Sequence, residues 1–320
     1  MEISIVILNW NGKFWLEKFL PNVISNSKET QVYVIDNAST DDSVIYLNEN
    51  FPNIITIKNS ENLGFAGGYN QGLKNIPGEI FCLLNSDVEV TENWLQPIIK
   101  LFLKDKNISA IQPKILDYNR RDYFEFAGAG GGLIDNLGFP YCRGRIFEEI
   151  EKDEGQYNDE TEIFWASGCV FFIRAEDFKL MNGFDERFFA HQEEIDLCWR
   201  LKNKGKKIYY CGKSTVFHVG GGTLNKQSTK KTFLNIRNNL SMLLKNLPSK
   251  SLFWILSLRL ILDGLAAIYF GLKNGFPHFT AVLKAHFGFY KQLKGTLKRR
   301  GSFQTKDYYQ SKWLIFKHFF

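Results

Sequence analysis

Apolar residues along the first hundred positions of the chain fall into two alternating patterns. Short, nearly continuous runs are typical of strands in a parallel sheet, where both faces are covered, and segments with helical spacing come between them. The strand-like runs lie at residues 3–10, 31–39, 53–59 and 79–87. The helix-like segments lie at residues 12–26, 41–51, 66–76 and 93–105. This alternation predicts an α/β protein with an open, doubly wound, mostly parallel sheet.

Each strand-like run leads into asparagine or aspartate. These residues are Asn9, Asn11, Asp36, Asn37, Asn59, Asn62, Asn85 and Asp87. The carboxyl ends of parallel strands meet at one edge of the sheet, and doubly wound sheets bind their ligands there. Asn and Asp also favour turns and helix caps, so any single position is as well explained by turn chemistry. Their occurrence after four successive strands favours a ligand site at that edge.

Asp87 is the first residue that points to a specific chemistry. It follows an apolar run, and a carboxylate at the end of a buried strand must be solvated, hydrogen-bonded or bound to a metal. Hard divalent cations prefer such oxygen ligands and keep positions for phosphate oxygens. His218 ends a later strand, before a glycine turn. It is a candidate second ligand, although a single histidine is more often structural.

A pair of acids, Glu193 and Glu194, opens a helix-like segment further along the chain. On a helix, Asp196 and Arg200 are four residues apart and are expected to pair, while Glu194 points to a different face. Two adjacent acids at this place can supply a general base. The alternative is a solvated acidic first turn, which the helix dipole favours.

Residues 119–160 show neither pattern, since they are rich in glycine first and in charged residues afterwards. A segment of this length without regular structure is seldom an idle connection. We therefore expect a flexible, functional loop over the site.

The region after residue 226 changes character. Ser251–Leu272 is apolar and long enough to span a bilayer, but Arg259 and Asp263 stand near its middle, where lipid tolerates charge poorly. The basic and aromatic segment at residues 278–300 suits a helix in the membrane interface. We expect peripheral docking on an anionic membrane surface, with Arg259 able to reach water or a lipid phosphate. A membrane span and a soluble helical appendage are the alternatives.

Composition narrows the classes of function. A chain of 320 residues suits one large domain, or a domain with an appendage. Its formal net charge of +6 allows nucleotide phosphates or anionic lipid as partners. We expect no nucleic acid, because the basic residues favour the C-terminal region and the sheet edge is acidic. The five scattered cysteines lack a CxxC pair, which is typical of reduced thiols in the cytosol. No basic start or cleavage site opens the sequence, so we expect no signal peptide.

Several segments together resemble the family 2 glycosyltransferases, and more narrowly their bacterial rhamnosyltransferase-like branch. The segments are SIVILNWNG at residues 4–12, VIDNASTDDS at 34–43, NLGFAGGYNQG at 62–72, LLNSDVEV at 83–90, SGCVFFIRAEDFKLMNGFDERFF at 167–189, EEIDLCWR at 193–200 and FHVGGGT at 217–223. The resemblance runs from about residue 2 to about residue 250, and its motifs are ordered and jointly specific. It implies a GT-A fold that binds a nucleoside diphosphate sugar with Mg²⁺ or Mn²⁺ and inverts the anomeric centre.

The resemblance also implies roles for individual residues. Asp36 matches the acid that binds the nucleotide base of the donor. Asp87 matches the last acid of the metal-binding DXD motif, whose first acid is replaced here by Asn85. Metal binding therefore rests more heavily on Asp87 and His218. The other residues that match the nucleotide-sugar site are Asn9, Asn11, Asn62, Gly64, Phe65 and Ser86. Glu194 takes the place of the catalytic base, and the Glu-Glu pair leaves open whether Glu193 or Glu194 does this work.

We therefore predict a GT-A catalytic domain at residues 1–225 and a helical, membrane-associating region at residues 226–320. The predicted function is inverting transfer of a sugar, such as rhamnose, from a dTDP- or UDP-linked donor to a glycan or lipid-linked acceptor. The reaction is predicted to belong to cell-surface polysaccharide synthesis. The enzyme is predicted to be cytoplasmic and peripheral on the inner face of the cell membrane. The alternative is a non-catalytic scaffold of the same fold that binds nucleotide sugar or carbohydrate.

Overall fold

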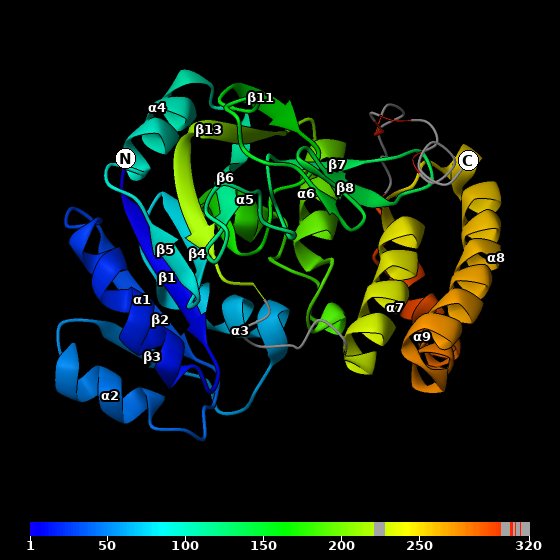
Figure 1. The fold of residues 1–320 in the computed structure, drawn as a ribbon, viewed down its shortest axis with the longest axis horizontal. Coiled ribbons are helices and arrows are strands. Elements are labelled where there is room, and N and C mark those ends of the chain that lie inside the picture. The colour runs from blue at the N-terminus through cyan, green and yellow to red at the C-terminus, as the bar shows by residue number, and fades with distance from the viewer. Residues whose placement is uncertain (221–227, 302–307, 310, 312–313, 315–320) are drawn as a thin grey trace.

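The computed structural model describes residues 1–220, 228–301, 308–309, 311 and 314. Its centre is one large sheet. The strands of this sheet are β1 (Ile3–Asn9), β2 (Gln31–Asp36), β3 (Ile55–Lys58), β4 (Ile80–Asn85), β5 (Val88–Val90), β6 (Ile108–Asp117), β11 (Glu160–Ile163), β12 (Val170–Arg174) and β13 (Lys207–His218). They lie in the order β11-β13-β6-β12-β4-β1-β2-β3, with β5 paired to β13 (Figure 1).

The four strands predicted from the sequence are neighbours in this sheet. β1 lies between β2 and β4, β3 follows β2, and all of these pairs are parallel. The second half of the sheet is mixed, because β12 is antiparallel to both β4 and β6, while β13 runs parallel to β6. The prediction of a doubly wound α/β sheet is confirmed, and the parallel half delivers four strand ends to one edge.

Helices cover both faces of the sheet. The helices of this layer structure are α1 (Lys13–Ser25), α2 (Ser43–Asn50), α3 (Gly64–Gly72), α4 (Leu95–Lys104), α5 (Ala175–Leu180) and α6 (Glu193–Asn203), with short 3-10 turns η1 (Leu73–Asn75) and η2 (Glu186–Phe188). Side chains alternate along a strand, so Ile5 and Ile7 of β1 pack with α1, α2 and α4. Val6 packs on the other face, in the core that contains α3, α5 and α6.

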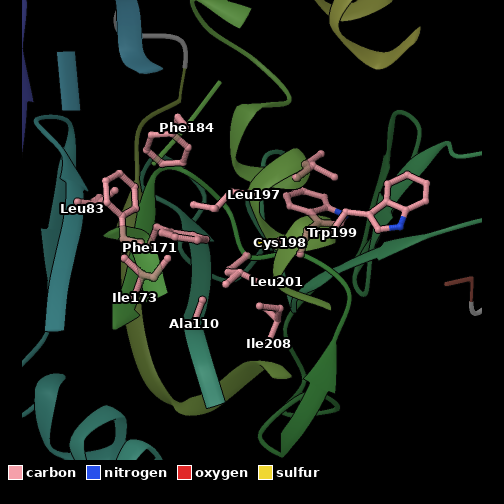
Figure 2. Close-up of a cluster of buried hydrophobic side chains, with 14 of the residues drawn as sticks. Leu83, Ala110, Phe171, Ile173, Phe184, Leu197, Cys198, Trp199, Leu201 and Ile208 are labelled. Carbon is pink, nitrogen blue, oxygen red and sulfur yellow. The ribbon is translucent and has the colours of Figure 1, made fainter. Parts of the chain in front are cut away.

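A cluster of buried apolar side chains fixes α6 against the sheet (Figure 2). The cluster joins Leu83, Ala110, Phe171 and Ile173 of the strands to Leu197, Cys198, Trp199 and Leu201 of α6. Trp199 is fully buried, and complete burial of a large apolar side chain contributes about 1.5–3 kcal/mol. The first residues of α6 therefore have a fixed position relative to the strand ends.

Residues 119–160 form a second, small sheet with the strand order β10-β9-β8-β7. Its strands are β7 (Gly132–Ile134), β8 (Pro140–Cys142), β9 (Arg145–Ile146) and β10 (Glu149–Ile150). The prediction of a segment without regular structure is wrong. Strands of two or three residues leave no periodic signal in the sequence, and they are separated here by glycines with positive φ, such as Gly138 and Gly144.

Three long helices stand side by side at one end of the molecule (Figure 1): α7 (Thr229–Asn246), α8 (Ser249–Asn274) and α9 (Phe276–Lys298). Met242 and Leu243 of α7 belong to the same core as the sheet. Leu252 and Leu256 of α8 pack against that core and against a satellite cluster shared with α9. α7 therefore links the outer helices to the core of the sheet.

A buried ion network joins α6, α7 and the loop before η2. Lys245 of α7 lies 2.9 Å from Asp185 Oδ2 and 2.8 Å from Asp196 Oδ2. Asp196 also pairs with Arg200 at 2.8 Å, which is the pair predicted from the sequence. Burial alone would raise the pKa of both carboxyls. The facing cations outweigh burial and hold the pKa of Asp185 and of Asp196 below the ordinary value.

Replacing Lys245 by methionine should lower the free energy of unfolding near neutral pH by about 3 kcal/mol, because two buried carboxylates lose a cation. The lowered pKa values mean that this stabilisation is present above the ordinary pKa of 3.8 and is lost as the pH falls below it. Urea unfolding should therefore show a gap between variant and wild type that narrows in acid. The control is Lys202→Met, whose partner Glu162 is 43% exposed, with an expected change under about 1 kcal/mol. Equal losses in both variants would contradict the importance of the buried network.

Candidate active site

Polar side chains from β1, β2 and β4 meet at the carboxyl edge of the sheet. The strand register sets Asn9 beside Asp36, and Asn85 beside Leu8. Asn9 donates from Nδ2 to Asp36 Oδ1 at 3.2 Å, and both side chains are buried. Asn9 Oδ1 finds no hydrogen-bond donor among the described residues. A buried acceptor of this kind is a group that a bound ligand can satisfy.

Asn11 builds the turn after β2. Its Oδ1 accepts from the backbone N–H of Thr40 at 2.7 Å and of Asp41 at 3.3 Å. Its own N–H donates to Ser39 Oγ at 2.9 Å, and Ser39 N–H donates to Asp36 Oδ2 at 3.0 Å. Turn chemistry, the alternative considered for these positions, therefore accounts for the contacts of Asn11. The same contacts fix the wall beside Asp36.

Asn37 organises the segment after β3, a role that the sequence pattern did not assign to it. Its Nδ2 donates to Asn62 Oδ1 and to Gly64 O, each at 3.0 Å, and its Oδ1 accepts from Asn59 Nδ2 at 3.0 Å. Gly64 has φ 71°, and a Cβ there would collide with Phe189 O. The predicted donor-site residues Asn62 and Gly64 are thus held in place by Asn37. The sequence feature that could have indicated this role is the position of Asn37 directly after Asp36.

Asn85 and Ser86 reach the same edge from the end of β4. Asn85 Nδ2 lies 3.4 Å from His218 Nε2. A Cβ built at Gly12 would collide with Asn9 Oδ1 and lie 3.6 Å from Ser86 Oγ, so only glycine fits between those two side chains. Residues predicted from separate segments of the sequence therefore meet here.

Asp87 and His218, the predicted metal ligands, face each other. The pairing of β5 with β13 sets His218 opposite Val88, and Asp87 Oδ1 lies 3.2 Å from His218 Nε2. Both side chains are buried. Two ligands at ~2.1 Å on neighbouring vertices of an octahedron lie roughly 3 Å apart. The observed spacing is that of a direct hydrogen bond between the two side chains, and it also lies near the spacing of two ligands on one Mg²⁺ or Mn²⁺ ion. The glycine run after His218 continues into residues 221–227, which lie outside the described residues.

Glu125 contacts the other ring nitrogen of His218, and the sequence pattern gave no sign of it. Its Oε1 lies 3.4 Å from His218 Nδ1, and its Oε2 accepts from Ala127 N–H at 2.6 Å. A carboxylate beside Nδ1 helps to fix the orientation of the ring, as it does for metal-binding histidines. The part of the chain that the structure describes holds no cluster of three or more His, Cys, Asp or Glu that could bind a metal alone. The remaining positions would fall to phosphate oxygens and water.

The two acids at the start of α6 have different surroundings. Glu193 is only 4% exposed, and burial together with neighbouring Glu194 raises its pKa well above the usual value. Glu194 is partly exposed but its Oε2 is shielded from solvent, and burial raises the pKa of Glu194 to about 7. A Cβ built at Gly168 would lie 3.2 Å from the Phe65 ring and 3.8 Å from the Glu194 carboxyl carbon. Glu194 and the predicted donor-site residue Phe65 therefore both lie next to Gly168.

Two solved structures are similar in fold. GalNAc-T7 with UDP, GalNAc and Mn²⁺ has a TM-score of 0.59 at 18% identity, over 78% of this chain and 48% of that chain. The mannosyltransferase PcManGT of Pyrobaculum calidifontis, in complex with GDP-Man and Mn²⁺, has a TM-score of 0.54 at 12% identity, over 90% of this chain and 87% of that chain. This chain thus spans about half of the first and most of the second. At such identities the similarity shows the GT-A fold.

Three curated relatives are similar in sequence. The N-acetylglucosaminyl-diphospho-decaprenol L-rhamnosyltransferase of Mycobacterium tuberculosis is 23% identical over 68% of this chain and 75% of its own length. The low-salt glycan biosynthesis hexosyltransferase Agl10 of Haloferax volcanii is 23% identical over 79% of this chain and 76% of its own. The O-antigen chain rhamnosyltransferase WbaN of Salmonella anatum is 23% identical over 75% of this chain and 79% of its own.

The family follows from a match that covers most of the sheet. The model of glycosyl transferase family 2 matches residues 4–179, which is more than half of the 320 residues. This match and the rhamnosyltransferases among the relatives confirm the resemblance noted in the sequence. The chain therefore belongs to glycosyl transferase family 2, as a rhamnosyltransferase-like glycosyltransferase with the GT-A fold.

Proposed function

We propose that the enzyme moves a sugar from a nucleoside diphosphate sugar to a glycan or lipid-linked acceptor, with inversion, in cell-surface polysaccharide synthesis. The proposed donor is dTDP-linked rhamnose, with a UDP-linked sugar as the alternative. The names of the relatives support rhamnose as the sugar, and the UDP and GDP-Man in the structures of similar fold support a nucleoside diphosphate donor. The observation that carries the proposal is that Asp36 and the Asp87–His218 pair gather at one sheet edge, while Glu194 and Phe65 both lie next to Gly168.

In this proposal the carboxyl edge of the parallel strands binds the donor. Asp36 reads the base, and Asn9 offers its free Oδ1 to the nucleoside. The backbone turns held by Asn11 and Asn37 shape the surrounding wall. The remaining proposed contacts to the donor come from Asn62, Gly64, Phe65, Asn85 and Ser86.

Asp87 and His218 are proposed to hold a Mg²⁺ or Mn²⁺ ion. When bound, the cation neutralises charge that develops on the departing diphosphate. The contact of Glu125 with His218 Nδ1 keeps the ring oriented with Nε2 toward Asp87.

Glu194 is proposed to accept the proton of the acceptor hydroxyl. As that oxygen bonds to the anomeric carbon, the bond from this carbon to the diphosphate oxygen breaks, and its electron pair leaves with the nucleoside diphosphate. A single displacement of this kind inverts the carbon and needs no protein nucleophile. A pKa of about 7 suits a group that gains and loses a proton near neutrality. The Glu194→Gln variant is the test: loss of transfer with donor binding retained separates an enzyme from a scaffold that only binds nucleotide sugar.

We further propose that α8 docks the enzyme on the inner face of the cell membrane. α8 is long and apolar enough to cross a membrane, but the charges near its middle point into the protein. Arg259 and Asp263 lie 3.6 Å apart and are both 2% exposed. Arg259 donates to Leu137 O at 3.0 Å and stacks on the Phe139 ring at 3.5 Å. The expectation that Arg259 reaches water or a lipid phosphate is therefore wrong.

The opposite face of α8 is apolar and exposed. Its large exposed side chains are Phe253, Trp254, Ile261, Leu265, Ile268, Tyr269 and Leu272. Lys250 and Lys273 stand at the two ends of this face, and α9 adds exposed lysines. A helix with its charges inside and its apolar side chains outside suits lipid, and the lysines suit anionic headgroups. Because its inner face packs on α7 and α9, we propose that α8 lies along the membrane and does not cross it.

The wild-type enzyme should float with vesicles that contain anionic lipid and should be released by high salt or alkaline carbonate. Replacing Phe253 and Trp254 by serine should lower the bound fraction at least about tenfold, because two exposed aromatic side chains no longer enter the lipid. The matched control replaces Leu103 and Leu180, which are equally exposed apolar residues on α4 and α5, and should float like the wild type. Docking is refuted if wild type ignores the vesicles, and resistance to carbonate would indicate a span.

A further inference from the structure

The strained turn, residues 188–192, leads directly into the acids at the start of α6. Phe189 is the central residue of a γ-turn, with φ 64° and ψ −59°. The N–H of Ala190 donates to the carbonyl oxygen of Phe188 at 2.7 Å. A γ-turn with positive φ is rare and strained. His191 and Gln192 follow with φ of 70° and 73°. Such conformations cost on the order of 1–3 kcal/mol each in non-glycine residues, so surrounding contacts must hold them.

One buried side chain of α7 supplies such contacts. Asn238 is 0% exposed, and its Nδ2 donates to the carbonyls of Phe188 at 2.9 Å, Ala190 at 2.9 Å and His191 at 2.8 Å. The guanidinium of Arg237 donates to Asn238 Oδ1 at 2.7 and 2.9 Å and to Phe188 O at 3.1 Å. Two amide hydrogens are thus shared among three carbonyls that converge only while the turn keeps its shape.

The other side of the strained turn contacts the donor-site segment, which we define as residues 62–66 at the start of α3. Phe189 O accepts from the backbone N–H of Phe65 at 2.7 Å and of Ala66 at 3.2 Å. A side chain at Gly64 would collide with the same carbonyl. The turn is therefore fixed between α7 and the start of α3, and Glu193 and Glu194 follow directly after it.

We propose that Asn238 is a positioning residue that sets where the Glu194 carboxylate stands relative to the donor-site segment at Phe65. The inference rests on the proposed role of Glu194 as the base. A catalytic group displaced by about 1 Å loses on the order of 100-fold in rate. A strained turn that the Asn238 amide holds together with Arg237 and the N–H groups of Phe65 and Ala66 gives the base a single position.

The groups that face Glu194 make its pKa a reporter of that position. Glu193 precedes it, the Cys198 thiol stands one turn further along α6, and Phe65 and Gly168 face it without charge. Burial raises the pKa of Glu194, and backbone amides at the helix start oppose that rise. If the turn loosens, water reaches the carboxylate, and its pKa should fall toward the ordinary value of 4.5.

The test compares Asn238→Ala with Ser241→Ala. Ser241 is on the same helix, is 1% exposed and donates to Arg237 O at 2.9 Å, so the control also removes one buried hydrogen bond. Hydrogen exchange of the amides at residues 186–195 should speed up at least about tenfold in Asn238→Ala and stay unchanged in the control. NMR of ¹³C-labelled glutamate, assigned with Glu194→Gln, should show Glu194 titrating at lower pH. Neither readout needs a donor, so both remain informative if the proposed reaction is wrong.

With a donor that the wild type turns over, Asn238→Ala should lower kcat about 100-fold, change KM for the donor far less, and move the acid limb of kcat to lower pH. If that variant does not fold, Arg237→Gln should give the same changes in weaker form, because it releases Asn238 Oδ1. Unchanged exchange and unchanged Glu194 titration in a folded variant would overturn the proposal. So would equal changes in Ser241→Ala.

Discussion

Replacing Glu194 by glutamine should lower the rate of sugar transfer about 10²- to 10⁴-fold, the range that a general base contributes. Glutamine keeps the shape of the side chain beside Phe65 and Gly168, but it cannot take up the acceptor proton. Donor binding should therefore persist. Release of nucleoside diphosphate gives kcat, and calorimetric titration with the donor gives the affinity.

The pH dependence of kcat follows from the same residue. Burial raises the pKa of Glu194 to about 7, and a base acts only in its deprotonated form. The kcat of the wild type should therefore level off above about pH 7 and fall about tenfold for each unit below it. In the Glu194→Gln variant, kcat should no longer show this fall below about pH 7.

Glu193→Gln is the matched control for the base. Glu193 has the same carboxyl group one position earlier and is buried, so we expect a loss under about tenfold. If Glu193→Gln abolishes transfer and Glu194→Gln retains it, the roles are reversed. If both variants keep wild-type transfer, the proposed base catalysis is wrong.

Replacing Asp87 by asparagine should weaken Mn²⁺ binding at least about 100-fold and abolish cation-supported transfer. The substitution removes the carboxylate that faces His218 Nε2 at 3.2 Å and leaves the side-chain volume almost unchanged. Neutral amide oxygens are poorer ligands for hard cations than carboxylates. Electron paramagnetic resonance of free Mn²⁺, measured with and without nucleotide, reports the affinity directly.

The matched control for the metal site is Glu89→Gln. Glu89 lies two residues further along and pairs with Arg121 at 2.7 Å, so its loss should leave Mn²⁺ binding unchanged. Wild-type Mn²⁺ affinity in a folded Asp87→Asn variant would remove Asp87 from the site. Full turnover of the wild type in excess EDTA would show that the reaction needs no cation.

The parallel half of the sheet was predictable because its strands are buried on both faces and read as continuous apolar runs. β12 was harder to place, since nothing local shows that Val170–Arg174 inserts antiparallel between β4 and β6. The small sheet was missed because its strands are too short for a period. Long-range contacts, such as the backbone bond from Gly132 to Trp165, then hold it against the rest of the fold.

The gathering of polar side chains at one sheet edge was predictable where strand ends carry them. Asn9, Asp36, Asn85 and Asp87 follow from the rule that ligands bind at the carboxyl edge of a parallel sheet. Glu125 and Asn238 come from other parts of the chain and reach the site only through the fold.

For α8, the sequence showed the composition of the helix but not which face turns toward the protein. The apolar length of Ser251–Leu272 and the charges in its middle are plain in the sequence. Their orientation is not, because the spacing of Arg259 and Asp263 fits a face toward protein as well as one toward water. The buried contact of Arg259 with Leu137 decides between them.

Thermal unfolding with a panel of dTDP- and UDP-linked sugars, each with and without Mn²⁺, tests the central claim most directly. A ligand that binds the native state alone raises its stability, by about 2.7 kcal/mol at a concentration 100 times its Kd. At least one donor should raise the unfolding midpoint of the wild type, the rise should be larger with Mn²⁺, and Asp87→Asn should lose the Mn²⁺-dependent part. A wild-type midpoint that no donor raises with either Mn²⁺ or Mg²⁺ would contradict a nucleotide-sugar site at this sheet edge.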